Sequence, residues 1–424
     1  MIFLLEECIL TAGIITSLSG RFFVDAKPDF RKTWKRQLFV VWMAQFIAAN
    51  GFSFGLPFAP FFIQQDLQVP ASQLPFFVSL FGASAPLTMM LFAPIWGAVA
   101  DRFGRRKMLL RSYLGGLAAI GLMGFAANPW ILIFLRLVQG MFSGTVSAAQ
   151  TLVSSHTPEE HNGFALGSLH SAMFSGHMTG SFFGGIFAEY FGYRNAFLVT
   201  ALLMSLSFLL VWLGVEEHFV PVKSSVRKFV RNMIPERKIL KHVLPILLLM
   251  GFVLYCRQFD TSFVPLLVQD VLGTVTGASK WTGALSAVCG FAGVISGFAL
   301  GYLSDRYQPG RIAVCSAICA GVSMLAISVC SELAGIFVFR FLAVFAGSGL
   351  EPALQIWLSR MTNQENRGLI FGYASSMRSL GNGFAPLAAG AIVSIAGVRG
   401  IYVAGPVFFL IAAFAIYRTA QRKD

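Results

Sequence analysis

Charged residues are scarce in this sequence. Asp, Glu, Lys and Arg make up only 12% of the 424 residues, whereas 56% are apolar and the mean hydropathy is +0.70. A water-soluble chain of this length would form two or three domains with far more charge on their surfaces. The composition therefore excludes an ordinary soluble protein.

Several chemical patterns are also missing. The six cysteines include no CxxC pair and the histidines show no metal-ligand spacing, so we expect no metal site, no cofactor and no disulfide framework. Cys315 and Cys319 lie four residues apart on one helical face, where we expect buried small apolar residues rather than ligands. No nucleotide-binding loop or catalytic constellation appears, which argues against ATP-driven transport and against an enzyme.

The apolar residues gather in nearly uncharged stretches of about twenty, the length that a helix needs to cross ~30 Å of hydrocarbon. Because the bilayer core has no water to satisfy backbone groups, continuous helices are the expected structure. The sequence predicts an all-α membrane protein with twelve transmembrane helices in two six-helix repeats. The predicted spans are residues 37–63, 74–99, 108–126, 130–153, 164–188 and 194–214, then 243–269, 281–302, 312–331, 335–359, 369–395 and 398–417.

The spans divide the chain into five parts. We predict two six-helix bundles, residues 34–214 and 243–417, joined by a central cytoplasmic loop at residues 215–242. Residues 1–33 and 418–424 are predicted to be cytoplasmic tails.

The net charge of +13 reflects membrane topology rather than nucleic-acid binding. Of the 32 Lys and Arg residues, 25 fall on the side of the predicted termini, and only Arg194, Lys280 and Arg399 fall on the other side. Positive charge accumulates on the cytoplasmic side of membrane proteins. We therefore predict a multi-pass membrane protein with both termini in the cytoplasm.

The two halves repeat with an offset of 204 or 205 residues. Arg136 in the fourth span corresponds to Arg340 in the tenth, and Gly192 and Arg194 correspond to Gly397 and Arg399. Such a parallel repeat places a solute site near the middle of the membrane, between the halves.

The loop after the second span carries the strongest motif. It reads from Gly97 to Lys107, and a partial copy follows from Gly301 to Arg311. The run resembles the signature loop of the major facilitator superfamily, which implies a cytoplasmic gating role. The alternative is a simple basic anchor at the membrane face. The gating-loop candidates are Gly97, Asp101, Arg102, Gly104, Arg105, Arg106, Asp305 and Arg306.

Two further spans resemble motifs of this superfamily. The helix around Arg136 resembles its conserved-arginine helix, where the position is linked with proton transfer; a structural arginine is equally compatible. The fifth span resembles the antiporter motif of exporters, although Ser181 stands where that motif has proline. Small residues at this spacing also serve ordinary helix packing. The motif residues are Gly176, Gly180, Gly184 and Gly185.

Asp260 and Glu351 are acids within the second half. Arg257 is one turn from Asp260 on the same helical face, and Glu351 and Arg378 lie at a similar depth, so a Glu351–Arg378 pair is plausible. Carboxyl groups beside cations can couple proton binding to a conformational switch, which makes Asp260, Glu351 and Arg136 proton-coupling candidates. A permanent ion pair that locks the second half is the competing interpretation.

The first span has polar residues where many drug exporters of this superfamily carry an acid. Together with two arginines from spans of the second half, they form the set of substrate-cavity candidates: Asn50, Ser53, Arg257 and Arg378.

The resemblance covers residues 34 to 417 and is strongest to twelve-span bacterial drug:proton antiporters of the MdtG type. It implies a protein of the bacterial plasma (inner) membrane that exports a lipophilic or amphipathic small molecule in exchange for protons, by alternating access. It also implies a protein that works as a monomer in the lipid bilayer, without nucleic acid. One alternative is a dedicated transporter of an anionic metabolite or siderophore, which the intramembrane arginines favour. Another is a non-transporting solute sensor on the same fold.

Overall fold

The structure is a computed structural model, and it describes residues 30–217, 237–306, 309–362 and 367–421. Every regular element in these ranges is a helix or a helical turn. The predicted tails and central loop lie largely outside the described residues, since α2 begins at Phe30, α11 begins at Arg237 and α17 ends at Gln421.

The helices form two groups. The first half contains α2 (Phe30–Gly55), η1 (Leu56–Phe58), α3 (Ala59–Phe61), η2 (Phe62–Asp66), α4 (Leu74–Phe103), α5 (Arg105–Met123), α6 (Pro129–Met141), α7 (Thr145–His156), η3 (Glu159–His161), α8 (Asn162–Phe191) and α9 (Tyr193–Gly214). The second half contains α11 (Arg237–Gln258), η4 (Thr261–Phe263), α12 (Val264–Leu272), α13 (Ala278–Arg306), α14 (Pro309–Val329), α15 (Leu333–Ser348), α16 (Leu350–Met361) and α17 (Arg367–Gln421).

These elements follow the predicted spans. Within the described residues, eight helical stretches are long and apolar enough to cross a membrane. One of them, Ile370–Thr419, covers two predicted spans. The two spans meet at Gly397, where α17 bends because the φ of 70° is not helical. The all-α membrane fold is therefore confirmed.

Four spans are single helical stretches in which the regular α-helix is interrupted. The first breaks after Gly55 and the seventh after Gln258, while the fourth breaks at residues 142–144 and the tenth at Gly349. The breaks fall at repeat-equivalent positions: Gly144 and Gly349 are 205 residues apart. Irregular backbone is tolerated in a membrane where it lines a cavity. Residues beside each break, including Leu56, Ser143, Asp260 and Ser348, line the central cavity.

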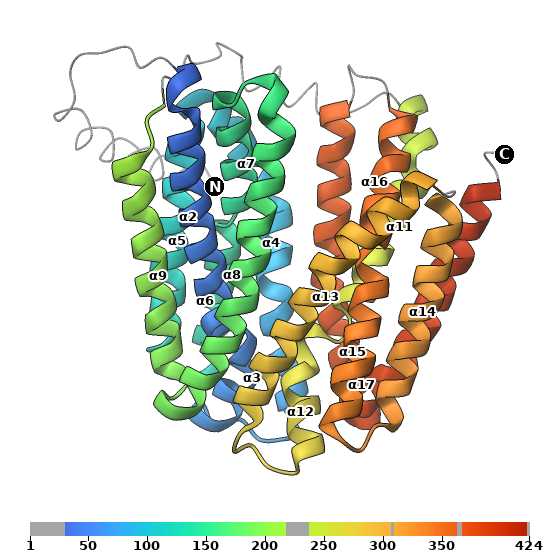
Figure 1. Ribbon diagram of the computed structural model, residues 1–424. Helices are drawn as coiled ribbons and strands as arrows, with labels where there is room; N and C mark the ends of the chain where they lie inside the picture. The colour runs from blue at the N-terminus through green and yellow to red at the C-terminus, as the bar shows by residue number, and fades with distance from the viewer. Residues whose placement is uncertain (1–29, 218–236, 307–308, 363–366, 422–424) are drawn as a thin grey trace.

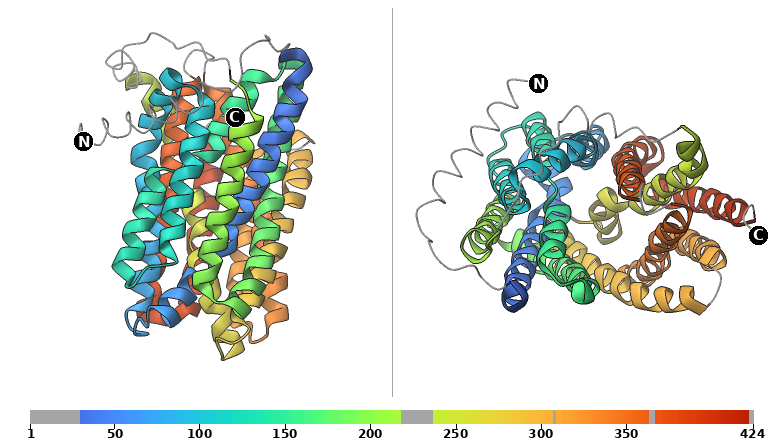
Figure 2. Two further views of the ribbon diagram at one scale, coloured as in Figure 1. Left: turned by 90° about the vertical axis from the view of Figure 1, so that its left-hand side faces the viewer. Right: turned by 90° about the horizontal axis from the view of Figure 1, so that it is seen from above.

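The two halves stand side by side (Figure 1). We call the end where α2 begins and α17 ends the terminal face, which is uppermost in Figure 1, and the opposite end the distal face. Seen along the bundle, the helices of each half form a separate group around the centre (Figure 2).

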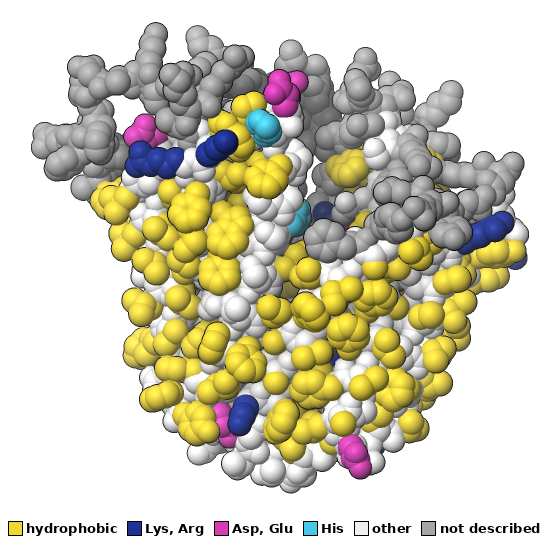
Figure 3. All heavy atoms as spheres, viewed as in Figure 1, with side chains coloured by type: hydrophobic (Ala, Val, Ile, Leu, Met, Phe, Trp, Pro, Cys, Tyr) yellow, Lys and Arg dark blue, Asp and Glu magenta, His cyan; other side chains and the backbone are white. Residues whose placement is uncertain are grey.

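Many large apolar side chains are exposed on the outside of the bundle. On the side shown in Figure 3, hydrophobic side chains cover the middle of the molecule, and charged side chains lie mainly near the two ends. Phe125, Leu213 and Ile395 each expose more than two-thirds of their surface. Large apolar residues are stable in such positions when the surrounding solvent is lipid. Cys315 and Cys319 also lie exposed on α14, so the expectation that they are buried is wrong.

Glycines bring α8 against α2 within the first half. A methyl group built on Gly176, Gly180 or Gly184 would lie only 2.2–2.4 Å from the carbonyl oxygens of Phe46, Asn50 and Phe54, respectively. Both sets of residues recur every four positions, so the two helices touch backbone to backbone along a stripe. Small residues permit this close approach, which is a main source of helix association in lipid.

Two further crossings join the halves. A methyl group on Gly185 of α8 would lie 2.5 Å from the carbonyl oxygen of Ser279 of α13, and one on Gly283 of α13 would lie 2.4 Å from the carbonyl oxygen of Ser181 of α8. At the repeat-related crossing of α17 with α4, a methyl group on Gly390 would lie 2.5 Å from the Cβ of Ser79.

Polar contacts reinforce closure at the distal face. The Tyr193 and Ser279 hydroxyls are 2.9 Å apart, and the backbone N–H of Gly277 donates to Glu189 Oε1 at 2.6 Å. From these contacts the described helices of the two halves diverge toward the terminal face (Figure 1). The halves therefore meet at the distal face.

Replacement of Gly180 by Ala should destabilise the fold, because its methyl group would meet the Asn50 carbonyl. We expect a loss of about 1–3 kcal/mol in the free energy of unfolding, typical of overpacking. Gly167 of the same helix has no atom within 4 Å of the corresponding position. Gly167→Ala should therefore be neutral or stabilising by up to about 1 kcal/mol. Unfolding of both variants in mixed micelles measures the difference, and equal stabilities would contradict the packing described here.

Candidate functional site

A cavity of about 790 Å³ lies between the two halves. This volume falls within the range of about 300–1,000 Å³ that is typical of sites for small molecules. Apolar residues such as Phe52, Leu56, Phe81 and Leu254 form part of its wall. Its described lining also contains many uncharged polar residues and six charged ones: Arg136, Arg257, Arg340, Arg378, Asp260 and Glu351.

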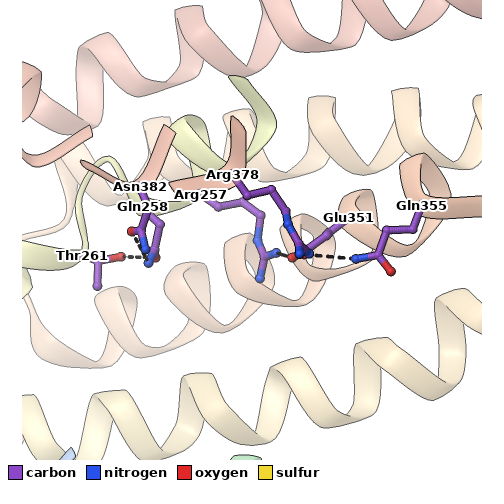
Figure 4. Close-up of polar contacts among 7 residues, drawn as sticks. All are labelled: Arg257, Gln258, Thr261, Glu351, Gln355, Arg378 and Asn382. Carbon is purple, nitrogen blue, oxygen red and sulfur yellow. Dashed lines mark hydrogen bonds and ion pairs between the residues drawn. The ribbon is translucent and has the colours of Figure 1, made fainter. Parts of the chain in front are cut away.

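Glu351 is the centre of an ionic cluster on the wall formed by the second half (Figure 4). Its Oε2 accepts a hydrogen bond from Arg257 of α11 at 3.0 Å, and its Oε1 accepts one from Arg378 of α17 at 2.5 Å. Gln355, one turn further along α16, donates to Oε1 at 3.3 Å. The three ionised side chains each expose about a quarter of their surface, 26–29%. The sequence suggested a Glu351–Arg378 pair from their similar depth in the membrane, and the structure contains this pair.

A chain of amides continues from this cluster along the same wall (Figure 4). Gln258 donates to Asn382 Oδ1 at 2.9 Å, and the Thr261 hydroxyl donates to Gln258 Oε1 at 3.1 Å. Since Thr261 follows the break after α11, these bonds stabilise the irregular backbone at the cavity wall.

Asp260 has a different partner from the one that helical spacing suggested. Because α11 ends at Gln258, Asp260 does not continue the face of Arg257, and it pairs instead with Arg340 of α15. Both side chains are only 10% exposed. The proposed Arg257–Asp260 relationship is therefore wrong, and the structure contains a buried Asp260–Arg340 pair.

The wall formed by the first half carries a cation with no carboxylate among its described partners. Arg136 donates to Gln139 Oε1 at 2.8 Å, and its guanidinium group lies 4.9 Å from the centre of the Phe81 ring. Ser53 and His177 are hydrogen-bonded to each other at 2.6 Å on the same wall. With both acids ionised, the described lining therefore has an excess of two positive charges.

The remaining predicted residues are distributed around this cavity. Asn50 is outside the described lining and donates to Thr179 at 2.9 Å, where it helps to join α2 and α8. Gly176, Gly180 and Gly184 pack against α2, whereas Gly185 packs against the other half.

The gating loop is described in part. Gly104 has a φ of 98° and separates α4 from α5, a conformation that favours glycine. The backbone N–H groups of Arg105 and Arg106 donate to the two carboxylate oxygens of Glu217 at 2.9 and 2.8 Å. Glu217 therefore satisfies the first turn of α5, where negative charge is favoured. Gly97, Asp101, Arg102, Asp305 and Arg306 lie within the described helices, but the structure does not describe the side chains of the four charged residues or the surroundings of Gly97.

Sequence reasoning missed several of these contacts. Arg340 appeared only as the repeat counterpart of Arg136, a signal that could have marked it as a cavity residue. Nothing in the sequence distinguished Glu217 as the partner of α5, because its two bonds depend on how α9 ends beside that helix.

The sequence profile of the Major Facilitator Superfamily matches residues 41–333 and 281–424. The chain belongs to this superfamily. It is 30% identical over 395 residues to the multidrug resistance protein MdtG of Salmonella arizonae, covering 93% of this chain and 98% of that protein.

Solved structures of other transporters share the fold. The bacterial homologue of the human lysosomal transporter Spinster, in an inward-facing and occupied conformation, gives a TM-score of 0.73 at 17% identity, covering 94% of this chain and 98% of that one. The nucleoside transporter NupG, solved as a mutant, gives a TM-score of 0.75 at 11% identity, covering 91% and 99%. As a member of the superfamily, the chain is a multi-pass membrane transporter of a small molecule and not an enzyme.

Loss of the Asp260 carboxylate should destabilise the second half. Asp260→Asn leaves the Arg340 charge buried without its partner, which typically costs about 3–5 kcal/mol. Denaturant unfolding of the purified protein in mixed micelles measures this loss. Asp260→Asn combined with Arg340→Gln should recover much of it, and Glu351→Gln should cost less because Glu351 is more exposed. An Asp260→Asn protein as stable as the parent would contradict this account.

Proposed function

We propose that this transporter exports lipophilic or amphipathic small molecules across the bacterial plasma membrane in exchange for protons. The relative from Salmonella arizonae, with which the chain shares nearly its whole length, is a multidrug resistance protein. The cavity has the size and the mixed apolar and ionic lining that such molecules require. The excess of basic residues near the terminal face supports a cytoplasmic location for that face.

The proposal rests mainly on Glu351, because its position makes it the carboxylate best suited to couple proton binding to transport. It is partly exposed in the cavity, and its two arginine partners come from two other helices, α11 and α17. Movement of either helix changes the charge around Glu351 and therefore its tendency to hold a proton. Asp260 is more deeply buried and pairs with a single arginine, which favours a structural lock. We assign Arg136 a supporting electrostatic role on the opposite wall.

The cycle that we propose is alternating access. Closure at the distal face by the crossings of α8 with α13 and α17 with α4 corresponds to a cavity that opens toward the cytoplasm. Rocking of the two halves would separate these crossings and open the cavity to the outside. In the gating loop, the bonds from α5 to Glu217 hold the terminal end of the first half together.

The charge of the cavity favours a second candidate, a dedicated transporter of an anionic solute. The described lining contains four arginines and two acids, so the site attracts anions more strongly than cations. The two candidates share the cavity and differ in the substrates that they predict.

Respiring everted membrane vesicles test the proposed function. Lipophilic cations and organic anions are added in turn, and collapse of the pH gradient reports exchange of the compound for protons. We expect collapse with the wild type and with Glu332→Gln, which changes an exposed acid between α14 and α15, but not with Glu351→Gln. Collapse by no compound in wild-type vesicles, with binding of an anionic metabolite retained, would favour the dedicated transporter.

Alternating access makes a separate prediction at the distal crossing. Gly283→Leu should hold the distal face open, because the larger side chain would meet the backbone of α8. An overpacking penalty of about 1–3 kcal/mol on the closed state changes its population by about 5- to 150-fold. In a cysteine-free background, Ser53→Cys labelling by a membrane-impermeant thiol reagent added outside should become faster. Gly297→Leu, on the same helix in open space, should leave the rate unchanged. Equal rates in the two variants would refute the role of this crossing.

A further inference from the structure

Arg257 and Arg378 hold the Glu351 carboxylate between them as they would hold a bound anion. The two guanidinium groups come from different helices, and each donates to a different oxygen of the same carboxylate. Two converging guanidinium groups form strong, directional hydrogen bonds to carboxylates, sulfonates and phosphates alike. All three side chains line the cavity, so a dissolved anion can reach the position that Glu351 occupies.

We propose that Arg257 and Arg378 form the binding site for the anionic group of an amphipathic solute, and that Glu351 is an internal counter-ion that such a solute displaces. This inference rests on the proposed function only in taking the cavity as the substrate site. The apolar residues Leu254 and Phe81 of the same cavity provide contacts for the apolar part of the solute.

Displacement changes the proton balance of the site. An anion that takes both arginines leaves Glu351 partly buried with only Gln355 as its described partner. A carboxylate in that position is disfavoured in its charged form, and it also repels the incoming anion. Binding is therefore accompanied by uptake of one proton from hydronium or a buffer acid in the solution: its bond to the donor breaks, one O–H bond forms on the Glu351 carboxylate, and no other covalent bond changes. Anion and proton bind with positive cooperativity, which is reciprocal by thermodynamic necessity.

The surroundings leave Glu351 as the group that takes this proton. On the same wall, Asp260 of the α11–η4 break stays paired with Arg340 of α15. The wall of the first half presents Arg136 and His177, and His177 is bonded to Ser53. The ionisable residues of α14 are Arg311, Cys315 and Cys319, and the two cysteines are exposed on the helix.

The charge of the solute decides whether its binding favours protonation or ionisation of Glu351. An anion binds best when Glu351 is protonated, whereas a lipophilic cation binds best when Glu351 is ionised. An anionic solute therefore carries a proton in its own direction, and a cation exchanges for one. The same carboxylate thus supports exchange for one class of solute and co-transport for the other.

Proton exchange on binding tests the proposal with two probes of permanent charge, octane-1-sulfonate and tetraphenylphosphonium. Binding to the purified full-length protein is measured by calorimetry at several pH values, and a pH indicator in weakly buffered solution reports proton movement. Octane-1-sulfonate should be bound with proton uptake, and its affinity should fall by up to about tenfold per pH unit as pH rises. Tetraphenylphosphonium should show proton release or none.

Variants separate this mechanism from simple electrostatic attraction. Glu351→Gln should bind octane-1-sulfonate more tightly at high pH, with no proton uptake and little dependence on pH. Arg257→Gln should lose at least tenfold in affinity for the sulfonate while its thermal unfolding remains cooperative. Glu332→Gln serves as the matched control and should behave as the wild type.

Two results would overturn the proposal: octane-1-sulfonate binding by the wild type without proton uptake, or failure of Glu351→Gln to bind it more tightly at high pH. The vesicle experiment is independent of both. If no cation exchanges for protons there while the sulfonate linkage holds, the proposed drug export fails and this inference stands. If exchange occurs and the linkage is absent, the proposed function stands and this inference fails.

Discussion

The close approach of α8 to α13, and of α17 to α4, is the constraint on which the rest of this structure depends. In lipid, helices gain nothing from hiding apolar surface, so close packing and backbone contact must hold them together. Gly185, Gly283 and Gly390 supply that contact at the distal face. Because each half is a packed bundle, contact at one end sets the separation at the other. The cavity and the distance between its charged walls follow from these two crossings.

The general fold could be predicted because the bilayer restricts the solutions to helices. Hydropathy predicted the all-α membrane fold, and the repeat offset related Arg136 to Arg340 and Gly192 to Gly397. The helix breaks could not be predicted, and the wrong partner for Asp260 followed directly from them. Spacing rules assume an unbroken helix, whereas the Glu351–Arg378 pair required only a common depth and was recovered.

The two walls of the cavity differ more in charge than in shape. Arg136 and Arg340 occupy equivalent positions, yet one contacts an amide and the other a carboxylate. Both acids of the described lining belong to the second half. A scaffold that is nearly symmetric therefore presents an asymmetric electric field to its solute. The described carboxylates are confined to one wall, while the other contributes an arginine with no carboxylate among its described partners.

At the distal face, in contrast, the two halves contain matching ion pairs. Arg194 pairs with Asp66 at 3.2 Å, and its counterpart Arg399 pairs with Asp270 at 2.9 Å. Asp66 and Asp270 are themselves 204 residues apart, so an entire interaction has been retained in both copies. Each half can thus be compared with the other, position by position. Interactions kept in duplicate mark the inherited framework, and residues present in a single copy, such as Glu351, mark where the ancestral symmetry gave way to specialisation.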